Sequence, residues 1–141
     1  MNTNKNMTHY INCAMEEAMK SDCRCKHGAV IVNNGKIISY GHNYERGYDD
    51  HGSTFPNNKI TRHAEQDAIL SCNDKILIRG ADMYVVRVKI NTVNNGRNQI
   101  LKKELSNSEP CHTCKQVIIN CMRRYGMRRV YYSSNNISEF T

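Results

Sequence analysis

The chain has 141 residues, a length that suits one domain with a buried core, so we expect a single domain over residues 1–141. Its apolar residues, 39% of the total, gather in short runs, none close to the roughly 18 needed to cross a bilayer. Residues 1–8 are polar and lack the apolar centre of a secretory signal. We therefore exclude a membrane-spanning chain and expect a cytoplasmic protein.

The cysteine count and the net charge further limit the kinds of protein that this chain can be. Seven cysteines, an odd number without a secretory signal, favour reduced thiols and metal ligands over a disulfide framework. The formal net charge of +7 is compatible with an anionic partner such as a nucleotide phosphate or a nucleic acid. A solubilising basic surface would explain the same charge, so the charge alone does not choose a partner.

The first part of the chain predicts a helix followed by a hairpin. Apolar positions three and four apart indicate a helix over residues 9–20. Two short β-rich runs, 29–32 and 36–40, flank Asn34-Gly35, a pair that readily takes positive φ and predicts a tight antiparallel turn. Residues 41–60 are rich in Gly, Asn, Asp and His and are expected to form a loop.

The middle of the chain predicts a helix and a strand. Thr61 is the expected N-cap of a helix that runs to about Cys72. Residues 83–88 indicate a strand buried on at least one face, and 94–96 indicate a turn. Residues 99–105 fit either a strand or a short helix.

The last part predicts one more helix and strand. The helix is expected over Cys111 to Tyr125, with Gly126 ending it, and the strand over 129–133. Strands that alternate with helices predict an α/β fold, a three-layer α-β-α sandwich around a mixed central sheet. Each of two candidate metal-binding motifs then opens a helix, where anionic thiolates and carboxylates are favoured.

These motifs are His63-Ala64-Glu65 and, 45 residues later, Pro110-Cys111-His112-Thr113-Cys114. One imidazole and two thiols are ligands that Zn²⁺ prefers, and three protein ligands leave a fourth position open, as in catalytic zinc sites. Zinc makes a bound water acidic near neutral pH, and Glu65 could move its proton. Cys111 and Cys114 alone could be a redox pair or half of a zinc finger, but neither reading explains His63 and Glu65.

On these residues the chain resembles the zinc-dependent cytidine/deoxycytidylate deaminase family. The resemblance covers roughly residues 22–134 and is strongest at 28–43, 62–69 and 109–114. It implies the cytidine deaminase-like fold, with Zn²⁺ held by three residues, His63, Cys111 and Cys114. It also implies that Glu65 takes a proton from the zinc-bound water, delivers it to the pyrimidine ring nitrogen, and helps ammonia leave after hydroxide attacks the ring carbon.

Two substrate contacts follow from the same resemblance. The backbone N–H of Ala64 is expected to bind the base carbonyl, as in relatives. Asn43 stands where many relatives place an asparagine that contacts the sugar, although asparagine is also a common turn residue.

The details of the motifs favour a cytosine nucleotide or nucleoside as the substrate, with dCMP first among these. A His rather than a Cys at position 63 differs from the free-cytidine branch, and residues 62–69 resemble most closely the enzymes that convert dCMP to dUMP. The alternatives are a deaminase acting on single-stranded nucleic acid or tRNA, for which Arg123, Arg124, Arg128 and Arg129 supply basic charge, and an inactive zinc-stabilised nucleic-acid-binding or assembly subunit. We also expect a homo-oligomer.

Two features stay open at this stage. Residues 91–109 exceed the short connection that relatives have before Pro-Cys, and they could shape a substrate entrance, form a subunit contact, or be an exposed hairpin. A second zinc site is conceivable from a further set of ligand types, although buried cysteines are common without metal. That set is Cys23, Cys25, His27, His51 and Cys72.

Overall fold

The structure of the protein is a computed structural model that describes residues 3–48, 59–134 and 137–140. Within these ranges none of the helices combines the length and the apolar character needed to cross a membrane. The elements follow in this order: α1 (Thr3–Ala18), β1 (Lys26–Asn33), β2 (Lys36–His42), β3 (Tyr44–Tyr48), β4 (Lys59–Arg62), α2 (Ala64–Ser71), the 3₁₀-helix η1 (Lys75–Ile78), β5 (Asp82–Asn95), β6 (Asn98–Ser106), α3 (His112–Tyr125), β7 (Arg129–Ser133) and β8 (Ile137–Phe140).

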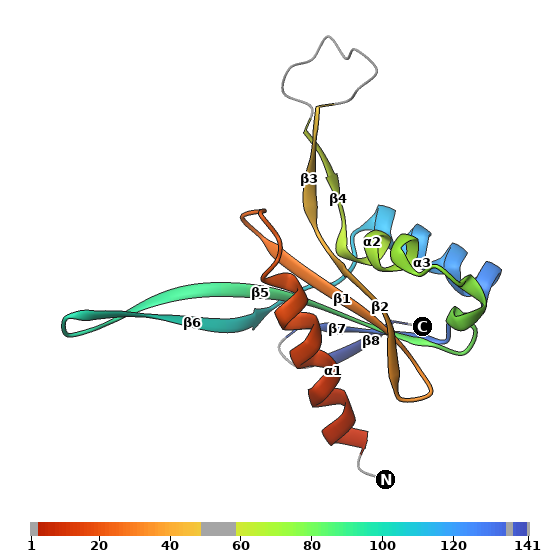
Figure 1. Cartoon of the computed structure of the whole chain (residues 1–141), viewed down its shortest axis with the longest axis horizontal. Coiled ribbons are helices and arrows are strands. Elements are labelled where there is room, and N and C mark those ends of the chain that lie inside the picture. The colour runs from red at the N-terminus through yellow and green to blue at the C-terminus, as the bar shows by residue number, and fades with distance from the viewer. Residues whose placement is uncertain (1–2, 49–58, 135–136, 141) are drawn as a thin grey trace.

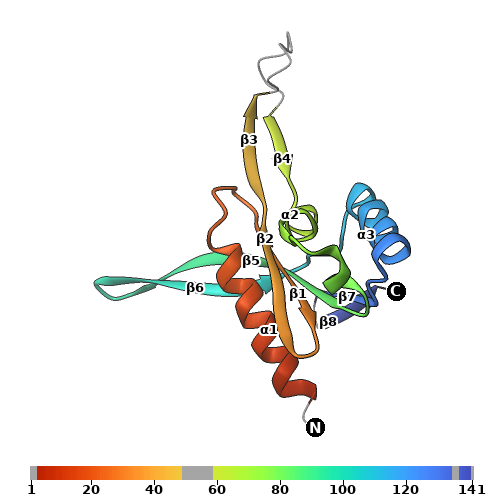
Figure 2. The ribbon, with the colours of Figure 1, turned by 45° about the vertical axis from the view of Figure 1, so that its right-hand side comes forward.

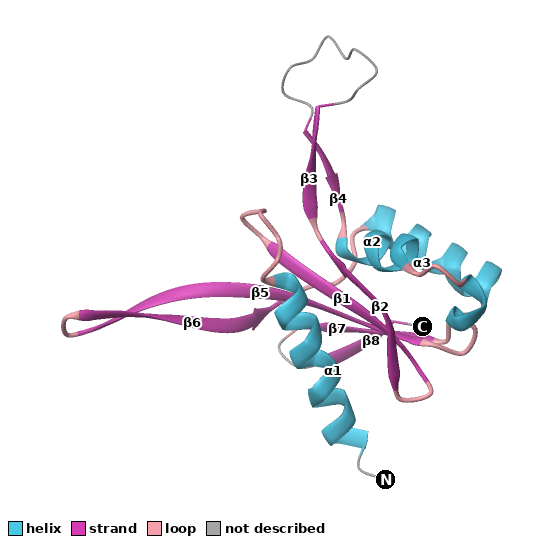
Figure 3. Cartoon of the chain, viewed as in Figure 1, coloured by secondary structure: helices cyan, strands magenta, loops and turns pink. Residues whose placement is uncertain are grey.

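A mixed sheet is the centre of the fold (Figures 1 and 3). Its strand order is β2-β1-β5-β7-β8, with β6 also paired to β5. The pairing of β5 with β7 is parallel, and the other pairings in this sheet are antiparallel. A separate two-stranded ribbon, β3–β4, rises beside the sheet.

Helices cover both faces of the sheet, so the predicted three-layer arrangement is confirmed (Figure 2). Successive side chains of a strand point to opposite faces. Ala29 and Ile31 of β1 accordingly pack with α2 and α3, whereas Val30 and Val32 pack with α1. Strand β5 divides in the same way, which gives one core on each side of the sheet.

The predicted hairpin at Asn34-Gly35 is confirmed. Both residues have positive φ, 51° and 75°, and Asn33 pairs with Lys36 across the turn. Positive φ at both central positions is the geometry of the turn that matches strand twist.

Two predictions between the hairpin and the second helix are wrong. The expected loop over 41–60 instead contains the end of β2 and the strands β3 and β4, while 49–58 lie outside the described residues. Thr61 is not an N-cap, because it lies in β4 opposite Glu45, and α2 begins after His63. A β-branched residue suits a strand, and the polar composition of this ribbon concealed its pairing.

The ambiguous segment 99–105 is a strand. Together, β5 and β6 form a long hairpin whose outer part, from Lys89 to Glu104, pairs only with itself (Figure 1). We call this outer part the arm. Of the alternatives considered for residues 91–109, an exposed hairpin therefore matches the structure over Asn91–Ser106. Strand β8, at the edge of the sheet, was not predicted.

Two glycines allow helices to lie directly on strands. A Cβ added at Gly28 would stand 2.0 Å from the Ala14 carbonyl oxygen of α1. A Cβ added at Gly41 would stand 2.3 Å from the Ala68 nitrogen and 2.4 Å from the Ala64 oxygen of α2. No side chain larger than hydrogen fits at either position while the helix stays in place.

We expect Gly41→Ala to lower the free energy of unfolding by at least about 2 kcal/mol, because α2 must move to admit a methyl group. Gly96→Ala is the control: Gly96 has positive φ (64°) but no heavy atom near the added Cβ, so only backbone strain of about 1 kcal/mol is expected. Urea unfolding of the two variants gives the comparison, and equal losses would contradict the close-packing argument.

Candidate active site and metal centre

The two predicted motifs meet where α2 and α3 begin. His63 is the N-cap of α2, with extended backbone (φ −84°, ψ 154°), and Cys111 is the N-cap of α3. The Nδ1 atom of His63 lies 3.0 Å from Cys114 Sγ and 3.7 Å from Cys111 Sγ. The ligand atoms of these three residues all lie within 4.8 Å of one another.

This arrangement fits Zn²⁺. Zinc–sulfur bonds of about 2.3 Å and zinc–nitrogen bonds of about 2.0 Å at tetrahedral angles separate ligand atoms by roughly 3.5–3.8 Å. Small shifts bring the three ligand atoms to that spacing. Burial raises the pKa of the Cys114 thiol above its ordinary value, and the nearby Glu65 carboxylate acts in the same direction. A bound cation and the N-terminus of α3 would offset this by favouring the thiolate.

Glu65 occupies the first turn of α2 beside the ligand group and is 5% exposed. Burial raises its pKa, and hydrogen bonds from its own backbone and from Cys114 partly oppose that effect. A carboxyl group whose pKa is raised towards neutral pH can both accept and donate a proton. Because His63 precedes the helix and Glu65 lies within it, both side chains line the same cavity although they are two residues apart.

The cavity beside these residues has a volume of about 250 Å³. It is lined by His27, Asn43, His63, Ala64, Glu65, Ser108, Glu109 and Cys111. All the predicted site residues except Cys114 line it, and Cys114 lies fully buried beneath it. His27, Ser108 and Glu109 were not predicted as cavity residues. The position of Ser108 and Glu109 just before Pro110-Cys111 was the available signal.

Asn43 has a structural task that the sequence did not reveal. Its Oδ1 accepts a hydrogen bond from the His27 N–H (2.8 Å), and its Nδ2 donates to the Cys25 carbonyl (2.6 Å). The amide therefore fixes the start of β1 against the end of β2. One N–H and one lone pair of the amide are left over, so the predicted sugar contact stays a prediction.

Two hairpins close at their roots beside the cavity. Tyr44 pairs with Arg62, whose guanidinium lies 5.5 Å from the Tyr44 ring centroid, so the β3–β4 ribbon returns to place His63 next to Asn43. Arg87 pairs with Ser106 in the same way at the root of the arm. The segment from Ser108 to Cys111, which ends at a candidate zinc ligand, comes shortly after this root in the chain.

Ser108 and Ser133 fix that segment to the sheet. The Ser108 Oγ donates to the Val85 carbonyl (2.9 Å) and accepts from the Ser133 N–H (3.0 Å). In return the Ser108 N–H donates to the Ser133 carbonyl (2.8 Å), and the Ser133 Oγ donates to the Ser106 carbonyl (2.6 Å). Both side chains are buried, so these bonds have little competition from water.

A second metal site does not form among the residues that the structure describes. Only His63, Cys111 and Cys114 make a group of three ligands there. Cys72 is buried in the core with Cys121, whereas Cys25 is exposed beside the Arg87 guanidinium (3.2 Å). His51 lies outside the described residues.

The comparisons agree with this geometry. A sequence profile of the cytidine and deoxycytidylate deaminase zinc-binding region matches residues 1–134. The chain belongs to this family. It is therefore a zinc-dependent nucleobase deaminase, and the predicted zinc cofactor and the predicted family are confirmed. No protein of curated function matches the sequence significantly.

Solved structures share the fold. The dCMP deaminase of cyanophage S-TIM5 in apo form is 23% identical, with a TM-score of 0.57 over 95% of this chain and 86% of that chain. The same phage enzyme in complex with dCMP and dUMP gives a TM-score of 0.58, again at 23% identity, over 94% and 82%. A diaminohydroxyphosphoribosylaminopyrimidine deaminase/reductase from Thermotoga maritima is 22% identical, with a TM-score of 0.50 over 91% of this chain and 29% of that one.

The zinc site generates a first test. We expect about one zinc per chain in the purified protein, and Cys111→Ser or Cys114→Ser should reduce it to roughly a tenth or less, because each removes one of three protein ligands. Cys25→Ser and Cys72→Ser should keep the wild-type content. Elemental analysis after dialysis measures this, and a lower zinc content in either control would reveal metal bound elsewhere.

The environment of His27 generates a second test. Burial, followed by the positive charges of Arg87 and His63, lowers the pKa of His27 to about 4 from 6.5. Between these values the unfolded chain binds more protons, so stability rises with pH across this window and is lost as pH falls from 6.5 towards 4. Between about pH 7 and pH 5 we expect His27 to contribute a loss of up to about 2 kcal/mol.

The measurement is urea unfolding at both pH values for the wild type and His27→Gln. The variant should lose less stability on acidification than the wild type, since both share any acid-induced loss of zinc. Substitution of the exposed His9 by Gln is the control and should leave the wild-type dependence in place. Identical curves for the wild type and His27→Gln would show that His27 is not held neutral.

Proposed function

We propose that the protein converts dCMP and water to dUMP and ammonia. The observation that carries this proposal is the buried Glu65 carboxylate, which shares one cavity with the zinc ligands His63 and Cys111. The resemblance of residues 62–69 to deoxycytidylate enzymes supports the choice of substrate. The phage enzyme that shares the fold was solved with dCMP and dUMP, which supports the same choice.

Zinc, when bound by His63, Cys111 and Cys114, supplies a Lewis acid that lowers the pKa of water. Glu65 takes a proton from the attacking water and gives it to the ring nitrogen of the base. It then takes the remaining proton from the hydroxyl group now bonded to the ring carbon and passes it to the amino group, so that the C–N bond breaks, ammonia leaves and the ring carbon keeps the oxygen as a carbonyl. Burial raises the pKa of Glu65, which favours the protonated form that it must adopt between the two proton transfers.

The other cavity residues orient the base. The Ala64 N–H, at the N-terminus of α2, is free of the helix's own carbonyls, and in this proposal it binds the base carbonyl. Asn43 keeps one N–H for the sugar while it holds the Cys25 and His27 backbone. Both contacts are part of the proposal.

Three further expectations belong to the proposal. All seven cysteines lie in the described part of the chain and none forms a disulfide there, which supports a reducing compartment such as the cytoplasm. The homo-oligomer expected from the sequence stays a prediction. An inactive zinc-stabilised subunit is disfavoured because a chain without catalysis has no need to bury the Glu65 carboxylate, at a cost in free energy, beside the metal.

The Glu65→Gln variant tests the mechanism. It should keep its zinc and lose roughly 10²–10⁴-fold in kcat, because the amide cannot transfer the proton. Glu16→Gln, which neutralises an exposed carboxylate on α1, is the control and should keep full activity. Activity that survives Glu65→Gln would contradict the role of Glu65.

The substrate is tested by ammonia release from a panel. It contains dCMP, cytidylate, cytidine, deoxycytidine, guanine and short single strands. We expect the highest kcat/KM with dCMP. Zinc-loaded protein that is inert on every compound would support the inactive subunit instead.

A further inference from the structure

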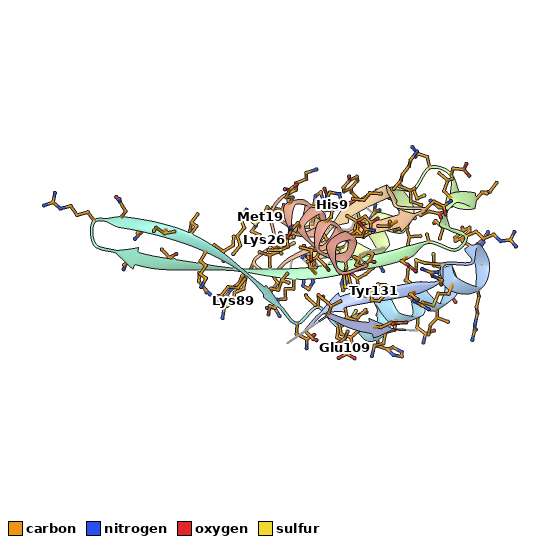
Figure 4. All side chains as sticks on the ribbon, turned by 90° about the horizontal axis from the view of Figure 1, so that it is seen from below. His9, Met19, Lys26, Lys89, Glu109 and Tyr131 are labelled. Atoms are coloured by element: carbon orange, nitrogen blue, oxygen red, sulfur yellow. The ribbon has the colours of Figure 1, made fainter. Side chains whose placement is uncertain are left out.

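A basic groove lies at the root of the arm, outside the catalytic cavity. It has a volume of about 480 Å³, roughly twice that of the cavity. It is lined by Arg24, Cys25, Lys26, Arg87, Val88, Lys89, Ile90 and Ser106. Four of these residues are cationic, and no lining residue is acidic. Figure 4 shows the labelled Lys26 and Lys89 where the arm leaves the sheet.

The four cations have no acidic partner among the residues that the structure describes. The Lys26 ammonium donates to the Ser21 and Cys23 carbonyls, and the Arg87 guanidinium contacts Cys25 Sγ. Glu104, which stands opposite Lys89 in β6, pairs instead with Lys102 (3.6 Å) and accepts from Asn91 (2.9 Å). Close positive charges without counter-ions repel one another, and a bound anion would relieve that repulsion.

Part of the groove lies on the same face of the sheet as the cavity, and the rest, with Lys26, Val88 and Ile90, lies on the face covered by α1. Strand alternation places Arg87 and Lys89 on the face of β5 that carries Met83 and Val85, which is the face covered by α2 and α3. Arg87 is also the partner of His27 in the pairing of β1 with β5, and His27 lines the cavity. A ligand that leaves the cavity past His27 therefore meets Arg87 first.

We propose that this groove binds the phosphate backbone of single-stranded nucleic acid, with one base of the strand directed to the cavity. The cavity has a volume of about 250 Å³, so in this proposal it takes one base and the rest of the strand lies outside it. The exposed Arg97 and Lys103 continue the positive charge of the groove along the arm, so the charge extends further than a single phosphate group. A single strand is specified because only an unpaired base can enter such a cavity.

This inference rests on the proposed function in one respect: it assumes that the catalytic cavity binds the base. The test therefore uses a fluorescent oligothymidylate of about 12 nucleotides, whose binding is independent of cytosine deamination. Fluorescence anisotropy at several salt concentrations gives the affinity and its salt dependence. For a single strand, each cationic side chain that contacts a phosphate contributes about 0.7 to the slope of the logarithm of the binding constant against the logarithm of the salt concentration, so its removal lowers the slope by that amount.

The test variant is Arg24→Gln/Arg87→Gln/Lys89→Gln. We expect at least about a tenfold loss of affinity near physiological salt and a slope reduced by about 2. The matched control, Arg79→Gln/Arg123→Gln/Arg124→Gln, removes the same charge from η1's end and from α3, and its slope should stay near that of the wild type. The zinc content of each variant shows whether it is folded. A milder second variant, Arg24→Gln/Lys89→Gln, changes only exposed residues and should reduce the salt slope by about two-thirds as much.

Three results would overturn the proposal. Equal losses in the test and control variants would mean that only net charge matters. If the test variants bind oligothymidylate with wild-type affinity, the strand binds outside this groove. If the test variants lose affinity for dCMP or pyrophosphate but bind oligothymidylate normally, the groove holds the phosphate of one nucleotide. Failure of the dCMP assay would leave oligothymidylate binding measurable, so the two proposals fail separately.

Discussion

The packing of α2 directly on β2 at Gly41 is the contact on which the site depends. Since the helix backbone approaches the strand with no side chain between them, the first turn of α2 has one position relative to the sheet. The Ser39 Oγ adds a hydrogen bond to the Ala68 carbonyl (2.6 Å), and the Asp67 carboxylate accepts from the His42 N–H (3.1 Å). This position places His63 and Glu65 at the edge of the sheet, where the N-terminus of α3 meets them. Backbone contact thus fixes the position of the zinc ligand His63 and of Glu65 relative to the sheet.

The paired bases of two hairpins, β3–β4 and β5–β6, position the other residues around the cavity. At one root Tyr44 pairs with Arg62, and at the other Arg87 pairs with Ser106, so the chain leaves the site and returns to it twice. Residues far apart in the sequence, such as Asn43 and His63, become neighbours in this way. The cavity and the zinc ligands consequently lie together, and the pairing of His27 with Arg87 brings one side of the groove next to them.

The chemistry was more predictable from the sequence than its surroundings. His63, Glu65, Cys111 and Cys114 are residue types with few other uses at that spacing, and helix periodicity with alternating strands indicated the layers. The β3–β4 ribbon was missed because its strands are polar and separated by a long connection, which reads as a loop. The structural role of Asn43 and the Ser108–Ser133 bonds depend on contacts between distant segments, for which a single sequence carries no local signal.

Strand β5 changes partners along one edge, and this has a consequence for how such chains can vary. Asp82–Val85 pair with β7, whereas Arg87–Asn95 pair with β6, and Ser108 and Ser133 lock the point of exchange. Residues added to or removed from the tip in matched pairs would lengthen or shorten the ribbon beyond this lock without shifting Cys111. Evolution is therefore free to resize the arm, and to adjust what it reaches, while the hydrolytic centre stays unchanged.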